Sequence, residues 1–596
     1  MLRRTLRTPL STAPIYRHSS RFAHQYQTRL KSLDSTRFAT CAEGAFRRSS
    51  TAAPNFAKRS GTGLWTVALL ITVAVGGAFV VPFVKSSPKH KRIENTQSSP
   101  FVVSDLTDSY LVMAPNTPAG RPGTLTPDEE QKLREMWTMT LQVFGVELLG
   151  EGTNGSTTPA AVPASEAPAD KEGKKEKEKK KSRLNVFRRN KGEKGADTDS
   201  IASGTSTPSD ISSLSISAEH DKHGQTAEFK AAIANMPPEE LRRAFWSMVK
   251  HDHPDALLLR FLRARKWDVE KALVMMVSTM HWRLEEQHVD DDIVKNGELA
   301  ALNTKGDDAK AKKNADDFLT QLRLGKSFLH GLDNEGRPMC FVRVKLHKAG
   351  EQTEESLERF TVYTIETARL LLRSPIDTAT IVFDMTDFSM ANMDYTPVKF
   401  MIKCFEANYP ESLGTVLVYK APWVFNAIWT IIRGWLDPVV ASKVHFARSV
   451  DELAAFVPKS QIPTELGGDE KWEYKYPEPV PGENDKMDDT AARDDLEAKR
   501  KDIVNKYEAT VLEWIAAGDA GKSLDERRKE RDGLAEELRK NYWTLDPYVR
   551  SRSLYDRIGI IQPGGALDFY GKEKGPAAAA PVEAPKTVET SAEDLD

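Results

Sequence analysis

The stretch TATIVFDM at 378–385, a helical segment at 395–408 and the stretch LGTVLVYKA at 413–421 decide the fold. The first and last of these are largely apolar, which is typical of strands buried on both faces of a sheet. The helical segment between them would connect two such strands in parallel. A βαβ unit is therefore predicted.

Further elements precede this unit. Residues 327–332 and MCFVRVKL at 339–346 read as strands, and the DNEGRP between them is typical of a turn. A helix is expected at 354–373. Strand, helix, strand, helix and strand thus alternate, and an α/β fold with a mainly parallel sheet flanked by helices is predicted.

Helical patterns flank the sheet region. In 227–290, Asp255 and Asp268 precede apolar runs with helical spacing and are expected to cap helices. Thr126-Pro-Asp-Glu129 has the form of a capping box, so 126–146 is expected to be a helix that docks on the later domain. Residues 491–561 read as C-terminal helices with a narrow apolar face.

Several motifs occur in one order between residues 227 and 480. They are LLRFLRARKWDVEKA (258–272), GLDNEGRPM (331–339), VFDMTDFS (382–389), NYPESLG (408–414), APWVFNAIWTIIRGWLDPVVASKVHF (421–446) and PTELGG (463–468). In this order and spacing the chain resembles the CRAL-TRIO (Sec-fourteen-like) family of the phosphatidylinositol-transfer type. The resemblance implies N-terminal helices at 227–290 and a lipid-binding domain at 320–480.

The resemblance also implies a gate over an acyl-chain pocket. WVFNAIWTIIRGWL at 423–436 is apolar nearly all round, so as a helix it is either buried or faces lipid. An ordinary core helix is the alternative. Flat aromatic and flexible Met side chains suit a cavity that accepts varied chains. The residues predicted for the pocket and gate are Phe341, Phe383, Met385, Phe425, Ile428, Trp429 and Ile432.

For the lipid headgroup, the resemblance assigns Glu411 and Lys443, with Arg265 and Lys266 as a further basic pair. A carboxylate can accept hydrogen bonds from a polyol, and an ammonium binds a phosphate. The alternative for Glu411 and Lys443 is a surface salt bridge or solvated charges. The alternative for Arg265 and Lys266 is a basic helix end that interacts with its own helix dipole. The chain departs from the family pattern at two positions, with Ser412 where Arg is usual and Val440 where Thr is usual.

The predicted function is therefore binding of phospholipid, phosphatidylinositol in particular, and its transfer between membranes. The alternative is a non-exchanging binder of a small hydrophobic ligand, or a regulatory interaction module. No enzyme motif is complete, so no catalytic residue and no enzyme activity are predicted. His251-Asp252-His253 lacks the partners for a metal site. No cofactor is expected beyond a bound phospholipid, and the net charge of −2 gives no global attraction to nucleic acid.

The N-terminus predicts a membrane anchor. Residues 1–59 carry twelve Lys/Arg and two acids, like a mitochondrial presequence. Residues 60–84 contain no charge over 25 residues, which suffices for one transmembrane helix. A single-pass membrane protein is expected, in mitochondria or alternatively in the endoplasmic reticulum. Its partners would be membrane phospholipids.

The remaining segments are polar and of biased composition. Residues 85–125 read as a linker, and 150–225 as a disordered insert whose centre at 171–194 holds twelve basic and four acidic residues. This insert is interpreted as a polybasic contact with anionic lipid or as a solvated linker, and a nuclear-localisation or nucleic-acid-binding segment is a lesser alternative. Residues 575–596 read as a disordered tail.

Overall fold

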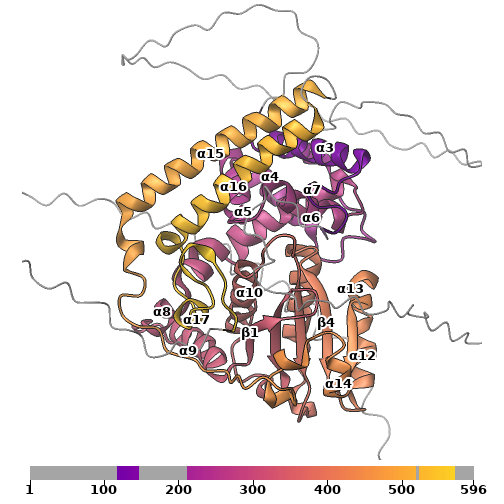
Figure 1. Ribbon diagram of the computed structural model, residues 1–596, viewed down its shortest axis with the longest axis vertical. Coiled ribbons are helices and arrows are strands. Elements are labelled where there is room, and N and C mark those ends of the chain that lie inside the picture. Colours follow the sequence, from indigo (N-terminus) through magenta and orange to yellow (C-terminus); the bar gives the residue numbers. More distant parts are fainter. Residues whose placement is uncertain (1–116, 147–210, 519–522, 571–596) are drawn as a thin grey trace, which may run out of the picture. The chain divides into compact units, whose positions relative to one another are not determined.

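The structure, a computed structural model, describes residues 117–146, 211–518 and 523–570. N-terminal helices, an α/β domain and two long C-terminal helices follow one another (Figure 1). The helices are α3 (Pro127–Val143), α4 (Gln225–Asn235), α5 (Pro238–Val249), α6 (Pro254–Ala264), α7 (Val269–His281), α8 (Lys295–Leu302), α9 (Ala309–Leu324), α10 (Glu354–Leu370), α11 (Tyr395–Lys403), α12 (Phe425–Arg433), α13 (Pro438–Ser442), α14 (Val450–Leu453), α15 (Thr490–Ala517), α16 (Leu524–Val549) and α17 (Leu554–Arg557).

One five-stranded sheet forms the centre of the α/β domain. Its order is β1-β2-β3-β4-β5, with β1 antiparallel to β2 and the other neighbours parallel. This arrangement confirms the predicted α/β fold with a mainly parallel sheet. The strands are β1 (Ser327–Leu332), β2 (Pro338–Arg343), β3 (Ala379–Asp384), β4 (Leu413–Tyr419) and β5 (Val444–Ala447).

The two faces of the sheet have different coverings. Helices α10, α11 and α12 connect successive parallel strands, and their side chains lie over one face. The other face is packed against the chain that follows β5, from α14 to Trp472. Because side chains alternate along a strand, each strand contributes one row of apolar side chains to each face. The apolar runs of the sequence follow from this double burial.

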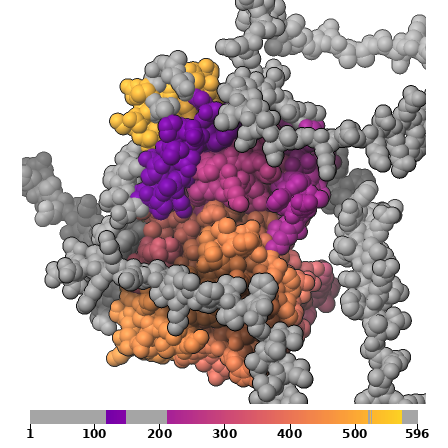
Figure 2. Space-filling view, turned by 90° about the vertical axis from the view of Figure 1, so that its right-hand side faces the viewer, coloured from indigo at the N-terminus to yellow at the C-terminus, as the bar shows by residue number. Residues whose placement is uncertain are grey.

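The N-terminal helices form a separate apolar core together with α15 and α16. Thr126 caps α3 with the expected capping box. Helix α3 packs against α6 and α7, although 110 residues lie between the end of α3 at Val143 and the start of α6 at Pro254. Figure 2 shows α3, in indigo, against the magenta helices and above the orange α/β domain. Segments from both ends of the chain therefore complete this core.

A buried aspartate joins these helices. His253, not Asp255 as expected, is the N-cap of α6, because its Nδ1 accepts the Asp255 backbone N–H at 3.1 Å. The Asp255 carboxylate instead accepts hydrogen bonds from Trp137 Nε1 at 2.8 Å and Tyr507 OH at 2.7 Å. Arg531 Nε donates to the same carboxylate at 2.9 Å. Asp268 does cap α7, accepting from Lys271 N.

The C-terminal segment covers the edge of the sheet at β1. Tyr555 OH accepts the Leu329 backbone N–H at 2.7 Å, and Tyr570 OH accepts the Leu332 N–H at 2.9 Å. An uncovered edge strand exposes such groups to pairing with another chain. These two tyrosines satisfy them within the chain.

Two segments that were predicted to be unstructured are packed in part. The end of the predicted linker 85–125 docks through Arg121, which pairs with Asp377 at 3.1 Å. The end of the predicted insert 150–225 buries Leu214 and Ile216. The predictions were wrong for the end of each segment. Arg121 forms an ion pair with the domain in one case, and Leu214 and Ile216 are buried in the other.

The predicted presequence 1–59, transmembrane segment 60–84 and tail 575–596 lie outside the described residues. Among the helices within 117–146, 211–518 and 523–570, none combines the length and the apolar character that crossing a membrane requires.

Candidate functional site

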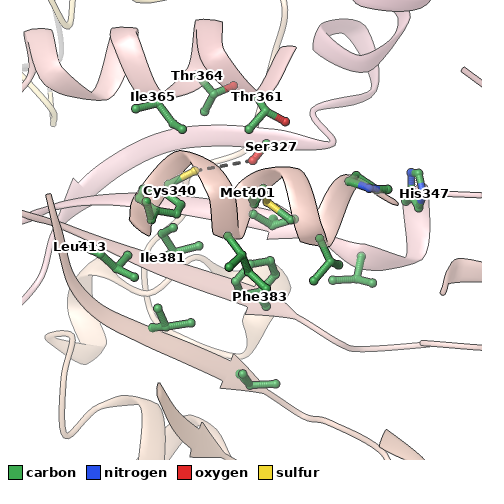
Figure 3. A pocket seen from close by; sticks show the side chains of 18 of the residues that line it. Ser327, Cys340, His347, Thr361, Thr364, Ile365, Ile381, Phe383, Met401 and Leu413 are labelled. Carbon is green, nitrogen blue, oxygen red and sulfur yellow. Dashed lines mark hydrogen bonds between the residues drawn. The ribbon is translucent and has the colours of Figure 1, made fainter. Parts of the chain in front are cut away.

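A cavity of about 300 Å³ lies between the sheet and helices α10, α11 and α12. Its volume is at the lower end of the range of small-molecule sites. The lining is mainly aliphatic, aromatic and Met side chains, with a few polar groups such as Ser327, Thr361 and Thr364 (Figure 3). A site of this composition accepts an apolar ligand and fixes it by few polar contacts.

The strands line the cavity with alternate residues. Cys340 and Val342 of β2, Ile381 and Phe383 of β3, and Val416 and Val418 of β4 face it. Cys340 Sγ lies 3.5 Å from Ser327 Oγ across the β1–β2 pair (Figure 3). Burial raises the pKa of the Cys340 thiol to about 11, so the thiol stays protonated and behaves as an apolar group.

Phe341 is not part of this cavity, contrary to the sequence prediction. It belongs to the opposite face of β2, where its ring stacks on Phe328 with centroids 5.2 Å apart. The reason is the period of two along the strand, which puts Cys340 and Val342 on the cavity side. An unbroken apolar run gives no sign of which residues take which face.

Helix α12 closes one side of the cavity. Phe425, Trp429 and Ile432 line it, at a spacing that places them on one helical face, and Phe383 and Met385 line it from the strand side. Ile428 does not border the cavity. It is buried one row further round the helix, in a cluster with Met385, Val418 and Phe425.

The outer side of the segment around α12 is also apolar. Trp423 is 85% exposed, and Ile431, Val439 and Phe446 are exposed as well. Large apolar side chains that gather on a surface usually mark a contact with a partner or a membrane. The segment 423–446 thus presents apolar groups to the cavity and to the outside.

Glu411 and Lys443 lie beside the cavity without lining it. Lys443 Nζ donates to Leu413 O at 2.8 Å and lies 3.8 Å from Glu411 Oε2. Both side chains are partly exposed. Their neighbours Ser412 and Val440, the two positions that depart from the family pattern, do line the cavity. The pair therefore borders the cavity at the amino-terminal end of β4.

Arg265 and Lys266 do not join this pair. The Arg265 guanidinium donates to Gln225 Oε1, and Lys266 is exposed on the turn after α6. Neither lines the cavity. The structure therefore does not bring Arg265 and Lys266 together with Glu411 and Lys443, and their assignment to the headgroup stays a prediction.

Arg260, which the sequence reasoning missed, is the α6 residue that reaches the Glu411 segment. It donates to Glu411 O at 3.0 Å and to Asp377 O at 2.7 Å. Arg263 and Arg121 both pair with the Asp377 carboxylate at 3.1 Å. Helical spacing between Arg260 and Arg263 was the available signal, since residues three apart share a face.

The histidine pair near α6 has a structural role. Burial lowers the pKa of His251 to about 3, so the ring is neutral at physiological pH. No group of three or more His, Cys, Asp or Glu side chains in the described part of the chain could hold a metal ion.

Two family models match the part of the chain that contains this cavity and the helices before it. The model of the CRAL/TRIO domain matches residues 322–468, and that of the CRAL/TRIO N-terminal domain matches 225–278. A CRAL-TRIO domain-containing protein of Schizosaccharomyces pombe is 43% identical over 448 residues, covering 75% of this chain and 93% of the relative. The chain belongs to the CRAL/TRIO family.

Other relatives carry the same domain. A protein of Eremothecium gossypii named phosphatidylinositol transfer protein CSR1 is 38% identical over 451 residues, covering 74% of this chain and 98% of that protein. Among solved structures, the crystal structure of Sfh5 matches at 16% identity with a TM-score of 0.29, covering 39% of this chain and 89% of that one. The cavity described above lies within the CRAL/TRIO domain, which is a lipid-binding domain.

Proposed function

We propose that this chain binds phospholipid, phosphatidylinositol in particular, in the CRAL/TRIO cavity and transfers it between membranes without chemical change. The observation that carries the proposal is the two-sided apolar segment around α12. Phe425 and Trp429 face the cavity, and Trp423 and Ile431 face outward. A segment of this kind contacts a membrane with one side while it opens a path for acyl chains on the other.

Two further observations support the proposal. The Glu411–Lys443 pair beside Ser412 offers an acceptor for inositol hydroxyls and a cation for the phosphate. The relative of Eremothecium gossypii, of which this chain covers 98%, is named a phosphatidylinositol transfer protein.

The test is transfer of labelled phosphatidylinositol from donor to acceptor vesicles by the full chain. Trp429→Asp places a charge in the apolar cavity beside α12, and we expect it to abolish transfer. Ala311→Asp, an exposed position of α9 outside the cavity and outside the segment around α12, is the control and should transfer nearly as well as the wild type. Equal transfer by Trp429→Asp would show that α12 is not a gate.

We also propose that residues 60–84 anchor the chain in a membrane, with mitochondria as the first candidate. The uncharged run of 25 residues supports this proposal. The anchored chain should remain in the pellet after carbonate extraction of membranes, and release into the supernatant would contradict the anchor. Co-fractionation with the endoplasmic reticulum would favour the alternative location.

A further inference from the structure

A buried lysine lies at the end of the cavity away from Glu411 and Lys443. Lys326 joins α9 to β1, lines the cavity, and is 5% exposed. Because β1 runs antiparallel to β2, Lys326 lies at the carboxyl ends of the parallel strands. Ser412 and Leu413 border the cavity at the amino end of β4. A strand of six residues spans about 20 Å, which separates these two ends.

The hydrogen bonds of Lys326 all involve neutral partners. Nζ donates to Gln352 Oε1 at 2.7 Å and lies 3.3 Å from His347 Nδ1. Since an ammonium can only donate, His347 Nδ1 is the acceptor. The ring proton is then on Nε2, which lies 3.3 Å from Asp394 Oδ2. Asp394 thus contacts the imidazole, and Glu351, Asp317 and Asp394 act on the ammonium only at a distance beyond an ion pair.

Lys250 shows how this fold treats a buried lysine with a structural role. It is equally buried, at 5% exposed, and its Nζ lies 2.8 Å from Glu366 and 3.1 Å from Asp290. Lys326 forms no ion pair with any carboxylate of the described residues. The two lysines match in burial and differ in their counter-ions.

The lack of a carboxylate in direct contact with the Lys326 ammonium has an energetic consequence. A buried charge is costly unless it is paired. Burial lowers the pKa of Lys326 to about 8, which still leaves most of the amine charged at neutral pH. The ammonium therefore borders a mainly apolar cavity, whose charged lining also includes Arg343, Arg369 and Asp394, as a cation that a ligand can neutralise.

We propose that Lys326 binds an anionic oxygen group, a carboxylate or a phosphate, of an acidic lipid in the cavity. This inference rests on the proposed lipid-binding function and extends it, because it places a second polar contact at the end opposite Glu411. A ligand whose acidic group lies there has its chain along the apolar sheet face. The site would favour acidic lipids over neutral lipids of the same chain length.

The experiment is equilibrium binding of labelled oleate, methyl oleate and dioleoyl phosphatidic acid to the full chain. Lys326→Met keeps the apolar stem and removes the charge. We expect it to weaken binding of oleate, of phosphatidic acid or of both by about ten- to a hundredfold, the range for a lost charged hydrogen bond. Loss for oleate alone identifies a carboxylate, and loss for phosphatidic acid alone identifies a phosphate.

Methyl oleate has the chain of oleate without the charge, so its binding should change little and reports an intact cavity. Lys345→Met is the matched control, since Lys345 is 41% exposed in its side chain, pairs with Asp387 and does not line the cavity. If Lys326→Met binds all three lipids as the wild type does, the inference is wrong and the proposed function stands. If the wild type binds none of the three, the inference is contradicted, whereas the proposed function is tested separately by the transfer of phosphatidylinositol.

Discussion

Lys443 Nζ lies 3.8 Å from Glu411 Oε2, too far for a hydrogen bond, while it donates to Leu413 O at 2.8 Å. The backbone carbonyl of Leu413 therefore positions the Lys443 ammonium near the Glu411 carboxylate, and the two charged groups form no hydrogen bond with each other. Glu411 sits in the left-handed region with φ +53°, and Arg260 holds its carbonyl oxygen. Both charged groups keep capacity for a ligand.

This geometry predicts a selective effect on inositol lipids. Lys443→Ala and Glu411→Gln should each weaken phosphatidylinositol binding by about ten- to a hundredfold, because each leaves a lipid polar group without its charged partner. Gln is chosen at 411 because it retains the side chain's length. Binding of phosphatidylcholine, which lacks the inositol ring, should change much less. Vesicle transfer of both lipids measures this.

The controls for this prediction come from the same chain. Lys459→Ala removes an exposed lysine outside the cavity and should have no effect. Ser412→Arg with Val440→Thr restores the family pattern at two cavity-lining positions and should strengthen inositol-lipid binding. Wild-type transfer rates for Lys443→Ala, Glu411→Gln and the double variant Ser412→Arg, Val440→Thr would contradict the headgroup assignment.

Removal of Arg531 should destabilise the packing of α3, α6, α15 and α16 around the buried Asp255 carboxylate. Arg531→Met leaves the buried Asp255 carboxylate without its cation, and breaking a buried pair in this way costs about 3–5 kcal/mol. Arg528→Met is the control, because Arg528 pairs with Asp525 on the surface, where such a pair contributes about 1 kcal/mol or less. Urea unfolding of the two variants compares them. Equal stabilities would mean that Asp255 is not held by Arg531.

Acid should destabilise the fold partly through His251. Its pKa is lowered by burial to about 3, whereas an unfolded histidine titrates near pH 6.5. Between these values the unfolded chain binds the extra proton, so the free energy of unfolding falls as pH falls. This contribution is complete above pH 6.5 and is lost progressively down to pH 3.

The variant that tests this is His251→Phe, which keeps an aromatic ring beside Trp543, 5.0 Å away between centroids. It should show a shallower fall of stability with acid between pH 6.5 and 4 in urea unfolding. His220→Phe replaces an exposed histidine and should leave the slope unchanged. An identical slope for His251→Phe would assign the acid sensitivity to other groups.

The sequence predicted the fold better than the site. Buried parallel strands such as β3 and β4 appear as continuous apolar runs, and Thr126 and Asp268 act as the caps that their positions indicate. Strand β5 was missed because Val444–Ala447 is short and two of its four side chains are exposed. Local sequence patterns therefore predict a strand that is buried on both faces of the sheet, such as β3 or β4, but not a short and partly exposed one such as β5.

The site depends on distances that no local pattern contains. Phe341 was misplaced because all its neighbours in 339–342 are apolar, which hides the alternation between the faces. The resemblance indicated Arg265 and not Arg260, although it is Arg260 that contacts the Glu411 backbone. The local sequence does not indicate that Lys326 is buried, since its Nζ is held by Gln352 and His347 from a later part of the chain.

The most direct measurement of the central claim is mass spectrometry of the lipid that co-purifies with the full chain under native conditions. A lipid-transfer cavity beneath α12 predicts a phospholipid, with phosphatidylinositol among the species, and its loss in Trp429→Asp. A neutral isoprenoid, or no lipid at all, would contradict phospholipid transfer and favour a non-exchanging binder of a small hydrophobic ligand or a regulatory interaction module.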